Sequence, residues 1–435
     1  MSVKTFIKGT FILTLTGIIT RCLGFFFKVY LSRIIGAQGI GLYQLIMPLN
    51  AVGYAIAISG FEVAVSKLTA TYLAKKEPRM AYNTTLSALF YSLLISIGCC
   101  VAITRNSPVI AKYVFGNSEC SSLIKTLSLA LPFSSIHCMV TAYCLGQEKT
   151  LFPGLSQLLE QLIRMGSVYF IIKITKKTDA SIGVICLVVG EIGATIISLT
   201  YIIFCNKKAG SFHPPALIKS AKEIFPTYFP VSGNRILLYG LQSAEILILP
   251  KMLIKSGLNY TEALSALGII SGMAIPLILF PATLSNSVAL MLLPNVAKNQ
   301  NNTKTIIKTG NNSLIFSILF GFGCIVFFIT IGGKFGAYCF KESELTNYIL
   351  ILAWLCPFIF LSTTFKSILN ALGKSTQVFA NNMLSEVLCI IFILVCIPLW
   401  GIKAYMFGLL ISQASNALLQ LRSYYSLMRK SLTLN

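Results

Sequence analysis

The chain has 435 residues, of which 55% are hydrophobic and only 11% are charged. So few charged side chains cannot cover the surface of a water-soluble protein of this length. The formal net charge is +22, yet lysine and arginine are spread over short connections, and this pattern argues against a nucleic-acid-binding protein. The composition therefore predicts an all-α integral membrane protein.

Apolar runs of about twenty residues recur along the whole chain, and each is long enough to cross about 30 Å of hydrocarbon as a helix. The first run follows Lys4 and Lys8 but has no A-x-A-like cleavage site, so we expect a retained helix and not a signal peptide. The bias of lysine and arginine between alternate connections predicts that both termini are cytoplasmic. We predict about twelve transmembrane helices, over residues 6–30, 40–66, 83–104, 122–145, 151–172, 182–205, 226–250, 263–293, 311–332, 346–371, 380–399 and 401–421.

A weak internal repeat predicts two halves. Residues 131–164 and 356–388 share Pro-Phe, an apolar helix, a Leu-Gly turn with Lys and Thr nearby, and a second helix. That second helix carries Glu160 in the first copy and Glu386 in the second, and the longest hydrophilic connection, residues 206–222, lies near the midpoint between the copies. Parallel repeats of this kind build many transporters. We therefore predict two six-helix lobes, residues 1–210 and 211–435.

No sequence motif indicates catalysis or a metal site. Gly373-Lys374-Ser375 resembles the end of a phosphate-binding loop, but Ile368 stands where that loop needs its first glycine. The thirteen cysteines lie almost entirely inside apolar runs, no C-x-x-C pair occurs, and the two histidines are far apart in sequence. We therefore expect no enzyme activity, no cofactor and no metal, with energy supplied by an ion gradient, the membrane potential or the substrate gradient.

Polar and small residues follow one face of the first predicted helix. At helical spacing this face carries Thr10, Thr14, Gly17, Arg21, Gly24 and Lys28. A cation at the centre of a membrane helix costs about 2.5 to 3.5 kcal/mol on insertion scales, so it usually faces water or a partner. We favour a wet cavity lined by Arg21 and Lys28 over the alternative, in which the small residues serve close helix packing and the cations reach the membrane surfaces. Arg33 lies off this face and is predicted to be an interfacial anchor.

The seventh predicted helix repeats this design. Its polar face consists of Ser232, Arg235, Tyr239, Gln242 and, about one turn further on, Glu245. Arg235 and Gln242 are seven residues apart, as are the two cations of the first helix. We therefore predict a transport cavity to which both lobes contribute. A cavity lined by arginine and lysine favours an anion, and the planar fork of arginine suits phosphate.

Five of the thirteen acidic residues lie inside predicted helices, namely Glu62, Glu160, Glu191, Glu245 and Glu386. Glu62 and Glu245 are the better candidates for binding a coupling ion, H⁺ or Na⁺, or for tuning the cavity cations. Glu160 and Arg164 are four residues apart, so they either neutralise each other on one helix or join Glu386 as secondary candidates for the site. His137 is a lone histidine in an apolar helix, where we favour packing over proton relay.

Three stretches carry a resemblance to a known family. They are KGTFILTLTGIITRCLGFFFKVYLSRIIGAQGIGLYQLIMP at residues 8–48, LGQEKTLFPGLSQLLEQLIRM at residues 145–165, and LLYGLQSAEILILPKMLIKSGLNYTEALSALGIISGMAIPLILFPATL at residues 237–284. Over most of its length the chain resembles the stage V sporulation protein B family of polysaccharide and lipid-linked precursor exporters. The wider superfamily includes multidrug and toxin extrusion (MATE) antiporters and the lipid II flippase.

The resemblance implies a MATE-like fold of two six-helix lobes with a central cationic cavity and alternating access. It implies that an undecaprenyl-pyrophosphate-linked saccharide moves from the inner to the outer leaflet of the bacterial cytoplasmic membrane. In sporulation members this saccharide is the precursor of spore-cortex peptidoglycan. The first-helix motif TRxLGxxxK places Arg21 and Lys28 at family positions, and the seventh-helix motif places Arg235 and Glu245 there. Many relatives have proline where Glu62 stands, which leaves the role of Glu62 open.

The sequence therefore predicts a flippase or exporter of a lipid-linked saccharide such as lipid II, working as a monomer among membrane lipids. One alternative is an ion-coupled multidrug antiporter, whose cavity would be led by acidic and aromatic side chains. Another is an exporter of a different lipid-linked polysaccharide unit. A third, a non-transporting membrane scaffold, would leave the charges inside the membrane unexplained.

Overall fold

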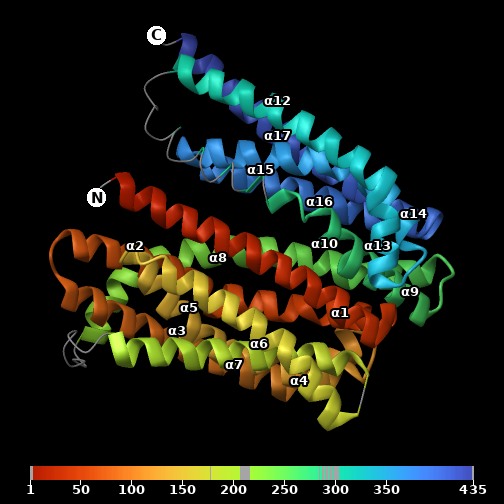
Figure 1. The fold of residues 1–435 in the computed structure, drawn as a ribbon, viewed down its shortest axis with the longest axis horizontal. Coiled ribbons are helices and arrows are strands. Elements are labelled where there is room, and N and C mark those ends of the chain that lie inside the picture. The colour runs from red at the N-terminus through yellow and green to blue at the C-terminus, as the bar shows by residue number, and fades with distance from the viewer. Residues whose placement is uncertain are drawn as a thin grey trace. The chain divides into compact units, whose positions relative to one another are not determined.

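The computed structural model describes residues 3–176, 178–205, 216–283, 285–286, 289, 292, 296 and 303–433. All regular elements of these residues are helices, coloured in Figure 1 from red α1 to blue α17. In chain order they are α1 (Val3–Ala57), α2 (Ser59–Ala74), α3 (Pro78–Val109), the π-helical η1 (Ile110–Val114), α4 (Cys120–Ser128), α5 (Ala130–Gly146), α6 (Leu151–Thr175), α7 (Ala180–Cys205), α8 (Ala216–Lys255), α9 (Tyr260–Leu267), the π-helical η2 (Gly268–Ala274), α10 (Ile275–Ile278), α12 (Thr303–Phe327), the π-helical η3 (Phe328–Gly332), α13 (Gly333–Phe340), α14 (Leu345–Leu352), α15 (Leu355–Ala371), α16 (Ser375–Trp400) and α17 (Ile402–Thr433).

The predicted all-α fold with about twelve membrane helices is confirmed. Within the described ranges, eight helical stretches are long and apolar enough to cross a membrane, and the pair α14 and α15, bent by 49°, makes a ninth. Helices α6 and α17 also coincide with predicted spans, at 151–172 and 401–421. Residues 206–215 of the predicted connection 206–222, and much of the predicted eighth span beyond residue 283, lie outside the described residues. Residues 216–222 of that connection belong to α8.

Packing divides the chain into two compact units, to which α1 and α8 each contribute a part. Unit 1 consists of Met1–Phe27 and Leu45–Ser243, and unit 2 consists of Lys28–Gln44 and Ala244–Asn435. The predicted boundary between two lobes, at residues 210 and 211, lies outside the described residues. The division into lobes 1–210 and 211–435 rests on the sequence repeat and stays a prediction.

Both copies of the sequence repeat form a helix, a short turn and a second helix. In unit 1 these helices are α5 and α6, and in unit 2 they are α15 and α16. Gly373, in the second turn, has φ of 72°, a backbone conformation that glycine adopts without a steric penalty. The stretch that resembled a phosphate-binding loop is therefore a tight helix connection.

The first two predicted spans are joined without a loop. Gly36 has φ of 68° and ψ of 179° inside α1, and only glycine adopts this conformation readily. Arg33, one turn before this bend, donates hydrogen bonds to the backbone oxygens of Cys339 (2.6 Å) and Tyr338 (3.2 Å). These carbonyls lie in the last turn of α13, where a cation is favourable. Arg33 thus caps a neighbouring helix of unit 2, and its role as an interfacial anchor stays a prediction.

A break between α1 and α2 is the main irregularity of unit 1. Ile58 leaves the helical conformation with φ of −124°, which frees carbonyl groups of the preceding turn. The Tyr228 hydroxyl, on α8, donates to the carbonyl of Ile56 (2.7 Å), and the Ser92 hydroxyl, on α3, donates to that of Ala57 (2.7 Å). Within hydrocarbon an unpaired backbone group costs several kcal/mol. Two neighbouring helices therefore make this break tolerable.

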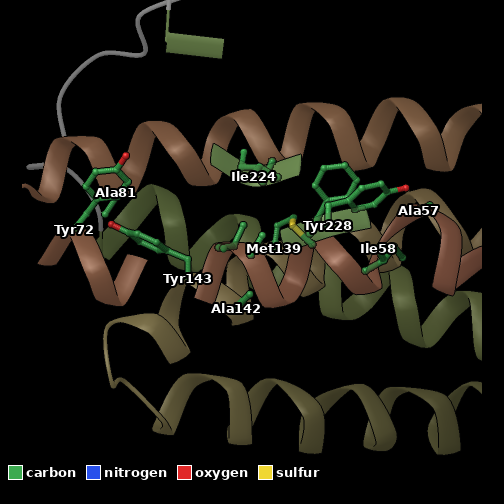
Figure 2. Close-up of a cluster of buried hydrophobic side chains, with 13 residues drawn as sticks. Ala57, Ile58, Tyr72, Ala81, Met139, Ala142, Tyr143, Ile224 and Tyr228 are labelled. Atoms are coloured by element: carbon green, nitrogen blue, oxygen red, sulfur yellow. The ribbon is translucent and has the colours of Figure 1, made fainter. Parts of the chain in front are cut away.

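Apolar side chains pack directly around the break. Figure 2 shows this core, which gathers residues of the α1 end, α2, α3, α5 and α8. Its fully buried members include Ile58, Phe61 and Met139, and the rings of Phe61 and Tyr228 lie 4.2 Å apart between centroids. Tyr228 thus bonds a backbone carbonyl at the break through its hydroxyl and packs in the core through its ring.

The described core of unit 2 is built by α12, α15, α16 and α17. Phe365 is fully buried there beside Tyr424, whose hydroxyl donates to the Ile306 carbonyl (2.9 Å). A row of amides links α16 to α17, with the Asn381 Nδ2 group donating to Gln420 (3.2 Å) and Ser423 (3.0 Å). These polar groups of unit 2 are therefore bonded between helices.

The outer surface of α3 shows why the protein needs lipid. Phe90, Leu94, Ile97 and Val101 follow one another at helical spacing, and each is at least 46% exposed. A large contiguous apolar surface of this kind is unfavourable in water. We assign this face to the hydrocarbon of the bilayer.

Gly60 allows the close contact between α2 and α8 and gives the first prediction. A Cβ atom on Gly60 would lie 2.6 Å from the Tyr228 carbonyl oxygen, whereas a Cβ on Gly98, on α3, would have no neighbour within 4 Å. We expect Gly60→Ala to lower the free energy of unfolding by about 1 to 3 kcal/mol through overpacking. Thermal unfolding of the purified protein in detergent measures this.

Gly98→Ala is the matched control, because it makes the same change on an open helix surface. It should leave stability unchanged or raise it slightly, since alanine favours the helix. Equal unfolding temperatures for the two variants would contradict the proposed role of Gly60.

Candidate functional site

The predicted site residues are divided between the two units. Unit 1 holds Arg21, Glu62, Glu160, Arg164, Arg235 and Gln242, and unit 2 holds Lys28, Glu245 and Glu386. Arg21 and Gln242 are exposed, and Lys28 is half-buried. Thr10 belongs to the first turns of α1, whose side chains lie outside the described part. The convergence of Arg21, Lys28 and Arg235 on one cavity stays a prediction.

Glu62 lies in the first turn of α2, directly after the break. Its Oε2 atom accepts a hydrogen bond from the Tyr54 hydroxyl at 2.9 Å and lies 3.8 Å from Nη1 of Arg235. Tyr54 belongs to α1 and Arg235 to α8, so one carboxylate joins three helices of unit 1. A negative charge is favourable in the first turn of a helix, where backbone N–H groups have no partner within the helix.

The contact at Gly60 explains why Glu62 and Arg235 meet. Gly60 is two residues before Glu62, and it lies against Tyr228 and Ser232 of α8. Ser232 is one turn before Arg235 on that helix. The close approach of α2 to α8 therefore carries the carboxylate to the guanidinium.

A second charge cluster joins α6 to α7, which lie side by side in unit 1 (Figure 1). Arg164 donates a hydrogen bond to Glu160 on its own helix, and its Nη2 atom lies 3.7 Å from Oε1 of Glu191 on α7. The three side chains are only 11% to 17% exposed. Mutual neutralisation of Glu160 and Arg164 is thus observed, and Glu191 is a further member of the cluster. The only sequence signal for Glu191 is a lone acid inside an apolar run.

The two clusters are connected by a cavity of about 340 Å³ in unit 1. Polar side chains dominate its wall, which is lined by Asn50, Tyr54, Glu62, Ser134, His137, Cys138, Thr141, Gln157, Glu160 and Glu191, with Leu13, Leu145 and Pro153. His137 is buried, and its Nδ1 atom is 2.8 Å from the Ser198 hydroxyl. The histidine is thus a bonded core residue, as favoured from sequence, and it also borders the cavity.

A second cavity, also of about 340 Å³, shares Glu62 and Leu145 with the first. Its remaining lining residues are Val63, Ser66, Lys67 and Ala142. Lys67 is exposed on α2. Glu62 therefore stands at the junction between an inner acidic cavity and a cavity that reaches the exposed part of α2.

In unit 2 the predicted acid Glu245 is buried and bonded. The Tyr405 hydroxyl, on α17, donates to Oε1 of Glu245 at 3.0 Å, and the two residues are 2% and 8% exposed, respectively. Lys366 on α15 and Glu386 on α16 are close enough to interact electrostatically, as are Glu386 and Glu245. Lys366 is not among the residues predicted from sequence, although a lone lysine in an apolar helix is a signal that could have identified it.

The arrangement in unit 1 supports two kinds of chemistry. The inner cavity presents carboxylates, which bind a proton or a cation. Arg235 and Glu62 are 36% and 31% exposed in their side chains, so the arginine can also be reached by an anion. The described lining of the inner cavity includes no lysine or arginine. The cations selected from sequence lie outside its wall.

Removal of Arg164 should leave two buried carboxylates without their shared cation. We expect Arg164→Ala to lower the free energy of unfolding by about 3 kcal/mol or more, the usual cost of breaking a buried ion pair. The unfolding temperature in detergent is the measurement. The same change in a Glu160→Gln, Glu191→Gln background should cost much less, and an equal loss in both backgrounds would show that packing and not charge is responsible.

Comparison with known proteins agrees with this architecture. The profile of the family described as "Polysaccharide biosynthesis protein" matches residues 6–300. Stage V sporulation protein B of Bacillus subtilis (strain 168) is 22% identical over 414 residues, which cover 92% of this chain and 80% of that protein. Lipid II flippase MurJ of the same organism is 22% identical over 320 residues, which cover 67% of this chain and 58% of that protein.

Solved structures share the fold. A multidrug resistance MATE family transporter of the MOP superfamily, in an inward-facing conformation, aligns with a TM-score of 0.71 at 15% identity, over 94% of this chain and 96% of that chain. A MOP superfamily transporter from Pyrococcus furiosus aligns with a TM-score of 0.70 at 12% identity, over 98% and 96% of the two chains. The chain thus groups with transport proteins and not with enzymes, and the resemblance seen in the sequence is confirmed. Because the profile covers more than half of its length, the chain belongs to the polysaccharide biosynthesis protein family.

Proposed function

We propose that the protein is a flippase that exports an undecaprenyl-pyrophosphate-linked saccharide across the cytoplasmic membrane by alternating access. The preferred passenger is a peptidoglycan precursor such as lipid II, with spore-cortex synthesis as its setting. The proposal is supported by the family match and by relatives named as a sporulation protein and as a lipid II flippase.

The single observation that carries the proposal is an accessible arginine inside a membrane helix. Arg235 lies on α8 with its side chain 36% exposed, and Arg21 is exposed on α1. A guanidinium within the bilayer needs a partner or water, and its planar set of donors matches phosphate oxygens. A pyrophosphate head group can bind such an accessible guanidinium, and the apolar tail of the same ligand remains in lipid.

The proposed setting is the cytoplasmic membrane, with both termini on the cytoplasmic side and the monomer as the working form. Lysine and arginine are more frequent in the connections assigned to that side. The acidic cavity of unit 1 supports coupling to H⁺ or Na⁺, because it offers Glu62, Glu160 and Glu191 in one polar space.

That cavity also favours a second candidate, an ion-coupled exporter of cationic compounds. Its wall contains three carboxylates, with Tyr54 and His137 beside them. A cationic drug would be attracted to such a wall. Reconstituted vesicles offered either ethidium or fluorescent lipid II distinguish the two functions, since an antiporter of this type would move ethidium and leave lipid II in its leaflet.

The flippase proposal makes a prediction for three cations. Arg21→Ala, Lys28→Ala and Arg235→Ala should each slow translocation of fluorescent lipid II in proteoliposomes at least about tenfold, because a charge-assisted hydrogen bond to phosphate contributes about 1.5 to 3 kcal/mol. Expression and unfolding temperature should stay near those of the wild type.

Arg79→Ala is the matched control, since Arg79 is exposed at the start of α3, outside the predicted site. It should leave the translocation rate unchanged. Full activity in all three variants would reject those residues as the phosphate contacts. A wild-type protein that moves no undecaprenyl-pyrophosphate-linked saccharide at all would reject the proposed function.

A further inference from the structure

Arg235, the proposed phosphate contact of unit 1, already has an anionic neighbour. Its Nη1 atom lies 3.8 Å from Oε2 of Glu62, a distance that makes an ion pair but exceeds that of a hydrogen bond. The same carboxylate oxygen accepts the Tyr54 hydroxyl at 2.9 Å. The short, directional bond of Glu62 is therefore to tyrosine, and its contact with arginine is longer and purely electrostatic.

We propose that Glu62 is an internal counter-ion of Arg235 that competes with the phosphate of the substrate and is displaced when the substrate binds. This inference rests on the proposed function, which supplies the phosphate. Glu62 then sets the affinity for the substrate and favours its release. This gives a role to a residue that, from the family resemblance, is proline in many relatives.

Exchange at Arg235 is favoured by the chemistry of both anions. A guanidinium carries five N–H donors in a fixed plane, and a phosphate group accepts two of them in parallel. The Glu62 contact at 3.8 Å is too long to be a hydrogen bond to any of these donors. With side-chain exposures of 36% and 31%, the pair is also open enough for a ligand to reach. The contact of a diphosphate with Arg235 is therefore expected to be more favourable in free energy than the contact of Glu62 with Arg235.

Displacement does not strand Glu62 as an unpaired buried charge. The carboxylate keeps the Tyr54 hydroxyl and its place in the first turn of α2. It also borders two cavities of about 340 Å³ each, one of which includes the exposed Lys67. Water in these spaces can solvate the freed carboxylate, so the desolvation penalty of a buried ion does not apply in full. When the phosphate leaves, Glu62 returns to Arg235, which favours release.

Contacts other than the ion pair hold α2 against α8. Gly60 packs on Tyr228 and Ser232, and the ring of Phe61, also on α2, lies 4.2 Å from that of Tyr228 between centroids. The Tyr228 hydroxyl also bonds the Ile56 carbonyl at the adjoining end of α1 at 2.7 Å. The geometry around Glu62 therefore does not depend on its charge, and Glu62→Gln, which can still accept from Tyr54, should fold normally.

The test measures binding of inorganic pyrophosphate to the full chain in lipid nanodiscs by isothermal titration calorimetry. Glu62→Gln should bind pyrophosphate about two- to fivefold more tightly than the wild type, since fivefold corresponds to the roughly 1 kcal/mol upper range of an exposed ion pair. The gain should vanish in an Arg235→Ala background, where there is no guanidinium to release. Tyr54→Phe should have the opposite effect, about a twofold loss, because Glu62 then pairs with Arg235 alone.

Two further variants separate charge from structure. Glu62→Asp keeps the charge and should bind pyrophosphate close to the wild-type affinity. Glu119→Gln neutralises an exposed acid at the start of α4, outside both charge clusters and both cavities, and it should leave affinity unchanged. Unchanged or weaker binding by Glu62→Gln would overturn the proposal. So would a gain that persists without Arg235, or a lack of binding by both the wild type and Glu62→Gln.

Failure of this inference is distinguishable from failure of the proposed function. If vesicles translocate lipid II while Glu62→Gln binds pyrophosphate like the wild type, only the counter-ion role is wrong. If Glu62→Gln binds more tightly but no lipid-linked saccharide is moved, the counter-ion role stands and the flippase assignment is wrong.

Discussion

The need to pair every polar group within hydrocarbon shapes the structure around the break between α1 and α2. An unpaired carbonyl or charge costs several kcal/mol there, so the break is possible only because Tyr228 and Ser92 bond the freed carbonyls of Ile56 and Ala57. That solution fixes α8 against α2 through Gly60. The contact of Glu62 with Arg235 follows from the same packing.

This constraint divides the charges of unit 1 into two kinds. Arg164 is enclosed by Glu160 and Glu191, with all three side chains at most 17% exposed, which suits a structural cluster beside a cavity. Arg235 is more open and more loosely paired. A protein that must bind an anionic head group and then release it needs an accessible cation whose resting partner is easily replaced. The loosely paired arginine meets that requirement, and the enclosed one does not.

Much of the fold was predictable because hydropathy decides it. Runs of about twenty apolar residues allow little except helices in a membrane. Most of the predicted spans that the structure describes coincide with observed helices, although the break at Ile58 interrupts the predicted span 40–66. The site was only partly predictable. The face from Arg235 to Gln242 follows from helical spacing, but the approach of Glu62 depends on a kink at Ile58 and a contact at Gly60 that no periodicity encodes. The contact of Glu191 with Arg164 could not be predicted for a similar reason, because it depends on the packing of α6 against α7.

The most direct measurement of the exchange at Arg235 is difference infrared spectroscopy of the full chain in nanodiscs as pyrophosphate is added. The carboxylate stretching bands report the bonding of Glu62 to its cation. We expect a carboxylate band that shifts on pyrophosphate binding in the wild type and is missing from the Glu62→Gln spectrum. Bound pyrophosphate with an unchanged carboxylate spectrum would show that Glu62 is not displaced from Arg235.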